Sequence, residues 1–562
     1  MSTRQKYSMG LDFGTNSVRA LLVDISNGKE ITSFVQNYES GDAGVITDPK
    51  DPNVARQNPS DWIKGMGIAI QRIIEMARKR KGFTPQNIIG IGIDTTGSTP
   101  LPVDKEGKPL SFYKEFKNNK NALAWLWKDH SSYAEAQEIT VLAGKEHPEY
   151  LAKCGGTYSS EWFFSKILHC LRTEAEVFDF AYSWVEFADY IPAVLTGIAD
   201  PLKMKRSVCA AGHKAMFNKE WEGLPSAKFL EKLHPKLGEL RQNRLYKKVY
   251  TSDIAAGGLT KEWAKKLGLK EGIPVTVGAF DAHMGAVGAG IKPGILVKII
   301  GTSTCDMMVV PNNKKLEDIP GLCGIVDGSI LPGYFGLEAG QSAVGDIFNW
   351  FVKNLVPPEY HQEAKVKNVD LHTLLTKKAG KLKPGESGLL ALDWNNGNRT
   401  ILVDARLTGL ILGQTLHTKA EEIYRCLMEA TGFGAKVIID RFEEYGVKVK
   451  EVINCGGITE KNPLLLQIYA DIFNRPMKIS RSEQTCALGA AIFGAVVGGA
   501  YKNTQEAQEA MCGLKKTLYQ PKPENQKIYE KLFKLYQQLY DIFGRREPSY
   551  NLGHVMKELL EI

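Results

Sequence analysis

Several signatures that define a protein class at once are absent from this chain of 562 residues. No GxxxxGK segment is followed by Ser or Thr, which excludes a P-loop as the nucleotide-binding element. No block of five or more basic residues occurs either, and the densest short cluster is ARKRK at residues 77–81. The formal net charge of +8 is spread along the chain, so we expect no nucleic-acid partner.

The cysteines and the apolar segments exclude two further classes. The nine cysteines are odd in number, show no CxxC spacing and follow no secretory leader, so we expect reduced thiols in the cytoplasm. Cys209 and His213 are four residues apart, but without two further ligands at metal spacing they do not predict a zinc site. The longest uncharged stretch, 486–501, is rich in glycine and alanine and short for a membrane span, so we expect a buried helix and no membrane partner.

The bulk composition is that of a folded globular protein. Hydrophobic residues make up 43% of the chain and charged residues 24%, and no long biased segment indicates disorder. A chain of this length exceeds what one hydrophobic core supports, so two or more domains are expected.

Two stretches share an apolar run, a polar turn with glycine, and a second apolar run. They are LDFGTNSVRALLVD at 11–24 and LVKIIGTSTCDMMVV at 296–310. Glycine lets the backbone approach a ligand closely, and successive turn amides flanked by hydroxyls form a concave anion site, so each turn is suited to hold phosphate. Gly14 and Gly301 lie about half the chain apart. The pair predicts a duplicated core, with two facing domains and a nucleotide between them.

Other segments place polar residues at the ends of predicted strands. The strand 88–94 is followed by a loop over 95–100, and ligands of open α/β sheets bind at such ends. A strand that ends at Val277 leads to Asp281 at the start of a glycine-rich helix, where the carboxylate is either a helix cap or a group aimed into a cleft. Gly90 and Gly92 begin a dinucleotide-like GxG that lacks the third glycine, which is a weak signal.

Helical spacing predicts helices over 61–80 and about 342–355. Helical patches and turns between about 121 and 250 indicate an insertion that forms a wall for a substrate. The segment after Lys502 is polar with a helical pattern.

Four stretches, in this order along the chain, resemble the FGGY family of carbohydrate kinases. They are LDFGTNSVRALLVD, GAFDAHMGAVGAG at 278–290, VKIIGTSTCDMM at 297–308 and NCGGITEKNPLLLQIYADIFNRPM at 454–477. The resemblance implies an α/β protein with two ribonuclease H-like (actin-like ATPase) domains flanking a central cleft. It implies a sugar-binding N-terminal domain over 1–291, a nucleotide-binding C-terminal domain over 292–501, and a helical extension over 502–562.

Further stretches, outside the nucleotide motifs, resemble the family members that phosphorylate L-ribulose. They are IGIDTTGSTPLPVD at 91–104, WLWKDH at 125–130, YSSEWFFSKILH at 158–169, AGHKAMF at 211–217 and GLEAGQSAVGDIF at 336–348. This resemblance implies a cytoplasmic enzyme of arabinose catabolism that converts L-ribulose to L-ribulose 5-phosphate and accepts other 2-ketopentoses. ATP and Mg²⁺ are the implied cosubstrate and cofactor.

The same resemblance assigns roles to single residues. Asp281 aligns with the general base, and Asp12 with the aspartate that holds magnesium through water. Residues aligned with nucleotide-binding positions are Gly14, Thr15, Asn16, Gly301, Thr302, Ser303, Gly456, Gly457 and Asn462. Expected contacts with the sugar, besides Asp281, are Thr96, Gly97, Lys214 and Glu338.

Structural explanations for these residues stay open at this stage. Lys214 could be an ordinary surface lysine, Glu338 a solvated glutamate, and Thr96 and Gly97 turn or capping residues. His169 stands where the family usually has tryptophan, three residues after Lys166, so the local sugar wall differs from the family pattern.

Two alternatives to the L-ribulose assignment also stay open. One is another sugar kinase of the same family, such as one for xylulose, because epimeric sugars differ in one or two hydrogen bonds. The other is an ATPase switch of the actin or Hsp70 type, although no peptide-binding domain is appended. The sequence does not fix the oligomeric state, and a homodimer is among the options.

Overall fold

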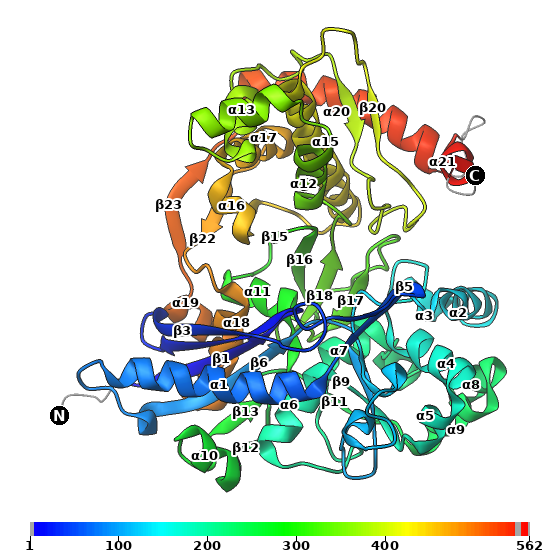
Figure 1. Cartoon of the computed structure of the whole chain (residues 1–562), viewed down its shortest axis with the longest axis vertical. Helices are drawn as coiled ribbons and strands as arrows, with labels where there is room; N and C mark the ends of the chain where they lie inside the picture. The colour runs from blue at the N-terminus through cyan, green and yellow to red at the C-terminus, as the bar shows by residue number, and fades with distance from the viewer. Residues whose placement is uncertain (1–4, 546–551, 560–562) are drawn as a thin grey trace.

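The computed structural model describes residues 5–545 and 552–559, and it contains two large mixed sheets, one in each half of the chain (Figure 1). The N-terminal sheet has the strand order β12-β13-β6-β1-β2-β3, with β14 paired to β6 as well. Its strands are β1 Tyr7–Phe13, β2 Ser17–Asp24, β3 Lys29–Asn37, β6 Ile88–Thr95, β12 Ala255–Gly258, β13 Pro274–Thr276 and β14 Ala279–Phe280.

The C-terminal sheet repeats the opening of the first. In each sheet an antiparallel hairpin comes first, and a later strand pairs in parallel with the first strand of the hairpin. The strand order is β17-β18-β16-β15-β21-β22-β23. The strands are β15 Ile295–Ile300, β16 Thr304–Pro311, β17 Gly324–Asp327, β18 Tyr334–Ala339, β21 Glu451–Cys455, β22 Met477–Ser480 and β23 Leu514–Tyr519. The predicted duplication of an α/β core is confirmed.

Helices cover both faces of the N-terminal sheet. On one face, α1 (Pro59–Arg78) packs on β2 and β3, and its apolar stripe shares one hydrophobic core with Met9, Leu11 and Phe13 of β1. The helix begins two residues before the predicted start, because Asn58 caps it and a proline at the first helical position fits the helix. Figure 1 shows α1 lying along the lower part of the sheet, below β3.

The opposite face is covered by a helix from the other half of the chain. This helix, α18 (Thr485–Val497), is the small-residue segment that the sequence predicted to be a buried helix, and it is buried. It packs on β1 and β6, and α11 (Asp281–Gly288) packs on α18 in turn. Each half of the chain thus supplies one helix to a layer that both sheets share.

Glycines let α18 approach the sheet. A Cβ atom on Gly92 would lie 1.7 Å from the carbonyl oxygen of Ala490, and one on Gly10 would lie 1.8 Å from that of Ala487. Gly90 meets Gly494 in the same way. Gly90 and Gly92 of β6 therefore serve the packing of α18, which explains why the third glycine of a dinucleotide-binding motif is absent from the sequence.

The insertion predicted at about 121–250 is mainly helical and has a hydrophobic core of its own. Its helices are α2 Tyr133–Glu146, α3 Pro148–Ala152, α4 Phe163–Thr173, α5 Ala175–Phe180, α6 Phe187–Thr196, α7 Val208–Lys214, α8 Ala227–Leu233 and α9 Pro235–Asn243. Two short sheets join it to the first lobe, one of β4 Ile46–Asp48, β5 Asp51–Gln57 and β8 Ala124–Trp125, the other of β7 Pro100–Val103 and β9 Ser183–Glu186. A third, of β10 Arg206–Ser207 and β11 Val249–Tyr250, lies within the insertion.

The remaining elements surround the C-terminal sheet, apart from α10 (Lys261–Leu267) in the first lobe. They are α12 Gly345–Asn354, α13 Pro358–Val366, α14 Leu371–Ala379, β19 Leu390–Leu392, β20 Leu410–Leu412, α15 Ala420–Glu444, α16 Gly457–Lys461 and α17 Pro463–Phe473. The helix expected from about residue 342 begins at Gly345, and the amides of residues 344–346 donate hydrogen bonds to the carbonyls of Gly301 and Thr302, between β15 and β16.

The tail differs from the helical extension that the sequence predicted. It contains α19 (Thr504–Met511), α20 (Pro523–Gly544) and α21 (Gly553–Leu559), but also β23, which is the edge strand of the C-terminal sheet. The strand was missed because an edge strand exposed on most of its length carries lysines and little apolar pattern. α20 buries Tyr529, Phe533, Tyr536 and Tyr540 in the core of the second lobe.

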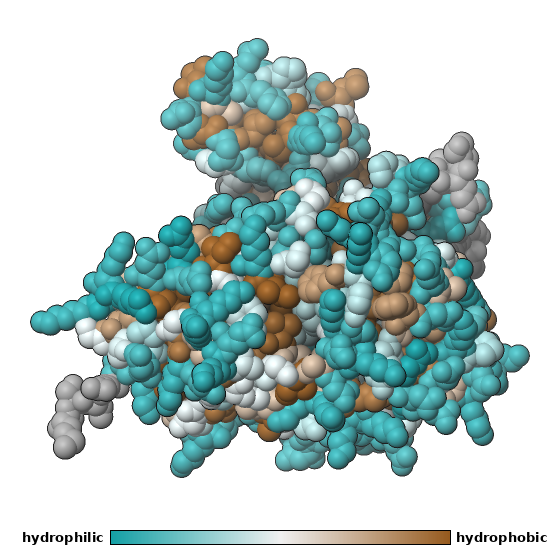
Figure 2. Space-filling view, turned by 60° about the horizontal axis from the view of Figure 1, so that its bottom comes forward, coloured by the Kyte–Doolittle hydropathy of each residue, from teal (hydrophilic) through white to brown (hydrophobic). Residues whose placement is uncertain are grey.

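The space-filling view shows a largely hydrophilic face on which apolar side chains form separate patches (Figure 2). Among the described residues, no helix combines the length and the apolar character that a membrane crossing requires.

Gly92→Ala should destabilise the protein by at least about 2 kcal/mol, because the new methyl group overlaps a helix carbonyl that cannot move without shifting α18. The matched control is Gly67→Ala in α1, where an added Cβ meets only the end of Lys266 at 3.9 Å. That change should leave stability equal or raise it by about 0.5–1 kcal/mol. Urea unfolding of both variants measures the difference, and equal midpoints would contradict the packing argument.

Candidate functional site

The first glycine turn lies between β1 and β2 and faces open space. The amide of Gly14 donates to the carbonyl of Ser17 at 2.9 Å, and a Cβ on Gly14 would meet only that same oxygen, at 3.5 Å. The turn is held from behind. Trp127 Nε1 donates to Thr15 Oγ1 at 3.0 Å, and Asn16 Nδ2 donates to the Ala43 carbonyl at 2.7 Å.

The second glycine turn lies between β15 and β16 and has the same form. The Gly301 amide donates to the Ser303 carbonyl at 2.9 Å, and the space in front of Gly301 is open. The carbonyls of Gly301 and Thr302 accept hydrogen bonds from the backbone at the start of α12. The turn is therefore anchored through its carbonyls, and Gly301 and Thr302 are exposed.

The diglycine that follows β21 lies beside this second turn. Gly456 has a φ of 99°, and a Cβ there would lie 2.4 Å from the Ile300 carbonyl oxygen, so only glycine fits. Nothing lies within 4 Å of a Cβ on Gly457. Asn462 is different: its side-chain oxygen caps α17 through the Leu465 amide, so its predicted nucleotide contact would have to use the backbone.

Three carboxylates gather at the carboxyl ends of adjacent strands. Asp12 of β1 is opposite Asp94 of the parallel strand β6, and Asp281 follows β14, which pairs with the end of β6. Arg19 Nη1 pairs with Asp12 at 2.8 Å, and it is the one cation that contacts this group among the described residues. Asp281 Oδ1 accepts from the Ala282 amide at 2.6 Å. As the first residue of α11, Asp281 does not act as the helix cap, which is Phe280.

Burial and mutual repulsion raise the pKa values of two of these acids. The pKa of Asp281 rises to about 7, because of burial first and the charge of Asp12 second. The pKa of Asp94 rises well above its usual range for the same reasons. Asp94 was not among the predicted site residues. The available signal was its position, because Asp94, like Asp12, is the last but one residue of an apolar strand.

The loop after β6 is tightly held. Thr96 is buried, its amide donates to the Phe13 carbonyl, and its hydroxyl lies 3.2 Å from that of Thr99. Gly97 packs against the ring of Phe280. Lys166, which is fully buried, donates to the Ser98 carbonyl at 2.7 Å and to two carbonyls of residues 125 and 126. Burial lowers the pKa of Lys166 to about 7.

Lys214 and Glu338 form an ion pair between the lobes. Lys214 ends α7, Glu338 lies on β18, and Lys214 Nζ is 3.1 Å from Glu338 Oε1. They are 8% and 9% exposed, so the surface-lysine and solvated-glutamate explanations are wrong. Burial alone would raise the pKa of Glu338, but the charge of the Lys214 ammonium outweighs it and holds that pKa well below its usual range.

The comparisons with known proteins cover both lobes. Residues 7–288 match the N-terminal domain, and residues 296–498 the C-terminal domain, of the FGGY family of carbohydrate kinases. The chain belongs to the FGGY family of carbohydrate kinases. It is 43% identical to a ribulokinase of Halalkalibacterium halodurans over 99% of this chain and 97% of the relative. It is 42% identical to a ribulokinase of Shouchella clausii over 99% of this chain and 98% of the relative.

Solved structures agree on the FGGY fold. A ligand-bound xylulose kinase from Lactobacillus acidophilus superposes with a TM-score of 0.77 at 19% identity, covering 97% of this chain and 99% of that one. At this identity the likeness concerns the fold alone. The predicted membership of the FGGY family and the actin-like two-domain fold are confirmed.

His169, at the position where FGGY kinases usually have tryptophan, faces the insertion. Its Nδ1 lies 3.0 Å from Glu135, and its ring packs edge-on against Trp125. It thereby supports Trp125, whose carbonyl binds Lys166.

One cluster of potential metal ligands lies beside the ion pair. His213, His283 and Glu338 bring ligand atoms within 4.8 Å of one another, and no other described residues do so in a group of three. Burial lowers the pKa of His283 to about 4 and lowers that of His213 well below its usual range, so both imidazoles are neutral. The Lys214 ammonium already binds both Glu338 oxygens, so the charge is balanced and we assign no metal here. Cys209 is not part of the group.

Asp12, Asp94 and Asp281 do not bring three ligand atoms within 4.8 Å of one another, but by donor type they fit the Mg²⁺ that FGGY kinases are expected to use. Their donors are carboxylate oxygens, which Mg²⁺ prefers, and no amide, hydroxyl or cation donates to either oxygen of Asp94 among the described residues. Asp12, with one oxygen engaged by Arg19, is the nearest of the three to the first glycine turn.

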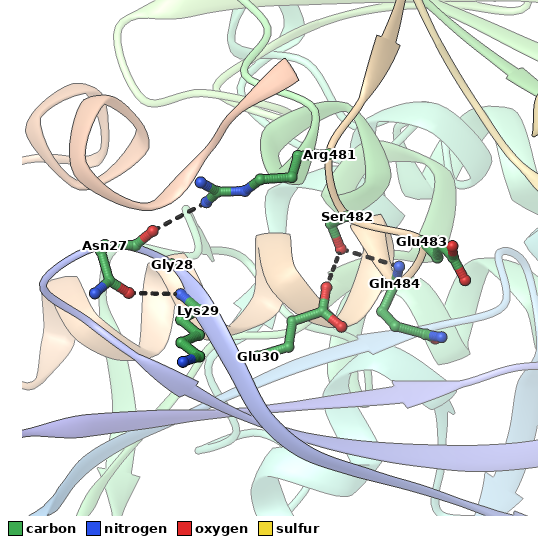
Figure 3. Close-up of a pocket in the computed structure, with 8 residues that line it drawn as sticks. All are labelled: Asn27, Gly28, Lys29, Glu30, Arg481, Ser482, Glu483 and Gln484. Atoms are coloured by element: carbon green, nitrogen blue, oxygen red, sulfur yellow. Dashed lines mark hydrogen bonds between the residues drawn. The ribbon is translucent and has the colours of Figure 1, made fainter. Parts of the chain in front are cut away.

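A separate polar pocket of about 520 Å³ lies behind this site, where the β2–β3 turn meets the loop before α18 (Figure 3). Arg481 Nη2 donates to the Asn27 carbonyl at 2.9 Å, and Ser482 Oγ donates to Glu30 at 2.6 Å. These bonds tie the loop between β22 and α18 to the first lobe. None of the predicted site residues lines this pocket.

Asp94→Asn should stabilise the metal-free protein, and more so at about pH 8 than at about pH 5. The folded pKa of Asp94 is raised, so the unfolded state loses the proton first, and the wild type loses stability as pH rises through this range. Asparagine escapes that loss. Thermal unfolding in EDTA at both pH values measures the gap, and a gap that shrinks with rising pH would refute the raised pKa. Added Mg²⁺ should stabilise the wild type more than the variant.

Proposed function

We propose that this chain is an ATP-dependent ribulokinase that transfers the γ-phosphoryl group of ATP to the C5 hydroxyl of L-ribulose, in arabinose catabolism. Ribulokinases at 42–43% identity over nearly the full chain support the substrate class. The observation that carries the proposal is the place of Asp281. Asp281 follows β14, which pairs with β6 beside Asp94 and Asp12, and two residues further along α11 His283 contacts His213 and Glu338, so Asp281 lies between the proposed nucleotide and sugar sides.

Asp281 is the proposed general base. Phosphoryl transfer requires an in-line hydroxyl, neutralisation of charge and removal of one proton. A carboxyl group with a pKa of about 7 is about half ionised at pH 7, and its ionised form is basic enough to take the hydroxyl proton as the bond to phosphorus forms. Its oxygen Oδ1 is fixed by the Ala282 amide, which leaves Oδ2 for the substrate.

The two glycine turns are the proposed phosphate sites. Residues 14–16 and 301–303 present open backbone with hydroxyls beside it, and such amides stabilise charge on phosphoryl oxygens. Gly456 and Gly457 are proposed to lie against the adenosine. Mg²⁺, when bound near Asp12 and Asp94, supplies charge neutralisation on the phosphate oxygens.

Lys214, Glu338, Thr96 and Gly97 are the proposed sugar contacts. A buried ion pair can donate from the ammonium and accept at the carboxylate, as a neutral polyol requires. The pair joins α7 of one lobe to β18 of the other, so closure of the lobes and recognition of the sugar would be coupled. Closure would also exclude water and limit wasteful hydrolysis of ATP.

The proposed location is the cytoplasm, where ATP is available. The nine cysteines are free thiols in the structure, in keeping with a reducing compartment.

Asp281→Asn should lower kcat by about 10²–10⁴-fold and leave ATP binding unchanged, because only proton removal is lost. In the wild type, kcat/KM for L-ribulose should fall about tenfold per pH unit below about 7, as Asp281 becomes protonated. Steady-state kinetics across pH, with calorimetry of ATP binding, tests both statements. Near-normal turnover of the variant, or an unchanged acidic limb in its residual activity, would remove the assignment.

The substrate is tested by ADP release with D- and L-ribulose and D- and L-xylulose, with glycerol and gluconate as controls. L-Ribulose should give the highest kcat/KM, since each hydrogen bond left unpaired with a wrong epimer costs about 1–3 kcal/mol. Preference for a xylulose would indicate a sister sugar kinase. Release of ADP that no ketopentose stimulates would indicate an ATPase switch instead.

A further inference from the structure

A chain of buried side chains runs through the second lobe from the tail to the second glycine turn. Tyr536 of α20 donates its hydroxyl to Asp393 Oδ1 at 2.8 Å, and Asp393 Oδ2 accepts from Gln341 Nε2 at 2.7 Å. Gln341 Oε1 accepts from Lys298 Nζ at 3.1 Å, and Lys298 pairs with Asp306 at 2.9 Å. All five side chains are at least nine-tenths buried.

Gln341 is also bound to the residue that ends the turn. The backbone amide of Gln341 donates to Thr304 Oγ1 at 2.9 Å, and the backbone carbonyl of Gln341 accepts from the backbone amide of Thr304 at 3.1 Å. Three residues further on, the Val344 amide donates to the Thr302 carbonyl at 2.8 Å. The position of residues 341–346 therefore sets the position of residues 301–304.

The hydrogen-bond donors and acceptors around Gln341 allow only one orientation of its side-chain amide. Its oxygen faces the Lys298 ammonium, and its nitrogen donates to Asp393 and to the Thr431 carbonyl. A flipped amide would turn its N–H groups toward the ammonium and its oxygen toward two acceptors. Asp393 thus fixes Gln341, and the Tyr536 hydroxyl fixes Asp393 in turn.

Tyr536 lies outside the part of the chain that matches the FGGY domains, which ends at residue 498. The tail does not need this hydroxyl to dock, because α20 is also held by its apolar stripe and by the Tyr529 hydroxyl, which donates to Glu429 at 2.9 Å.

We infer that Tyr536 is a positioning residue for nucleotide binding, acting through Asp393 and Gln341 on the glycine turn at residues 301–303. The inference rests on the proposed function in one respect, namely that this turn holds phosphate. It assigns the tail a part in the site: α20 completes the support of the turn at residues 301–303.

The loss of the Tyr536 hydroxyl would weaken the hydrogen bonds that link Asp393 to Gln341. Asp393 Oδ1 would be left buried and unpaired, which is costly for a carboxylate. Burial already raises the pKa of Asp393, and the hydrogen bonds from Gln341 and Tyr536 oppose that rise. Without Tyr536 the carboxyl is more readily protonated, and its hold on Gln341 weakens.

Tyr536→Phe should weaken ATP binding roughly tenfold, the value of one charged hydrogen bond of about 1.4 kcal/mol, and leave the KM for L-ribulose unchanged. The matched control is Tyr540→Phe. Tyr540 lies one turn further along α20, with its ring centroid 6.0 Å from that of Tyr536, and its buried hydroxyl has no hydrogen-bond partner among the described residues. Calorimetry with ATP measures the binding, and kinetics with varied ATP or L-ribulose gives the two KM values.

Equal ATP affinity in the Tyr536→Phe and Tyr540→Phe variants would overturn the inference, as would equal rises in both KM values. Asp393→Asn provides a second route, because asparagine cannot accept from both donors; it should raise the KM for ATP selectively and should not add to Tyr536→Phe in the double variant. Failure of the proposed function is separate. A wild type that binds ATP but does not phosphorylate L-ribulose would refute the ribulokinase proposal and leave the comparison of ATP affinities intact.

Discussion

Backbone contact between α18 and the glycine faces of β1 and β6 is the constraint on which the arrangement of this protein depends. The helix comes from the second lobe and lies on the sheet of the first, and α11 of the first lobe packs on it before the chain enters β15. No side chain fits between helix and sheet at Gly10, Gly90 and Gly92. The two glycine turns and the three carboxylates are thereby held around one helical layer.

Charge is distributed unequally around this layer, and the two regions suit different substrates. The acid cluster has three carboxylates and one arginine. Burial together with this excess of negative charge raises the pKa values of Asp94 and Asp281, and the proposed Mg²⁺ would neutralise the same charge. The pair of Lys214 and Glu338 is balanced within itself, with two neutral histidines beside it, which suits an uncharged polyol. Asp281 lies at the boundary, and its raised pKa is the electrostatic result of that position.

The parts of the chain outside the repeated core contact the site residues and hold them in place. The insertion supplies Trp127 to the first turn and Lys166 to the loop after β6. The tail supplies an edge strand and the aromatic stripe of α20 to the second lobe. Both additions are therefore built into the lobes they extend.

The sequence by itself determined the duplicated α/β core, the two glycine turns, the family and the candidate base. These depend on local patterns, namely apolar runs, turn residues and a set of short motifs in a fixed order along the chain. It could not place Asp94, the burial of Lys214 and Glu338, or the strand in the tail, since these depend on which segments become neighbours. Asn462 was predicted to contact the nucleotide from its place in the motif, and only the fold shows that its side chain caps a helix. Tertiary structure alone decided the pKa of Asp281. Burial comes from the packing of the fold, and the nearby charges of Asp12 and Glu338 belong to strands that are distant from Asp281 in the sequence.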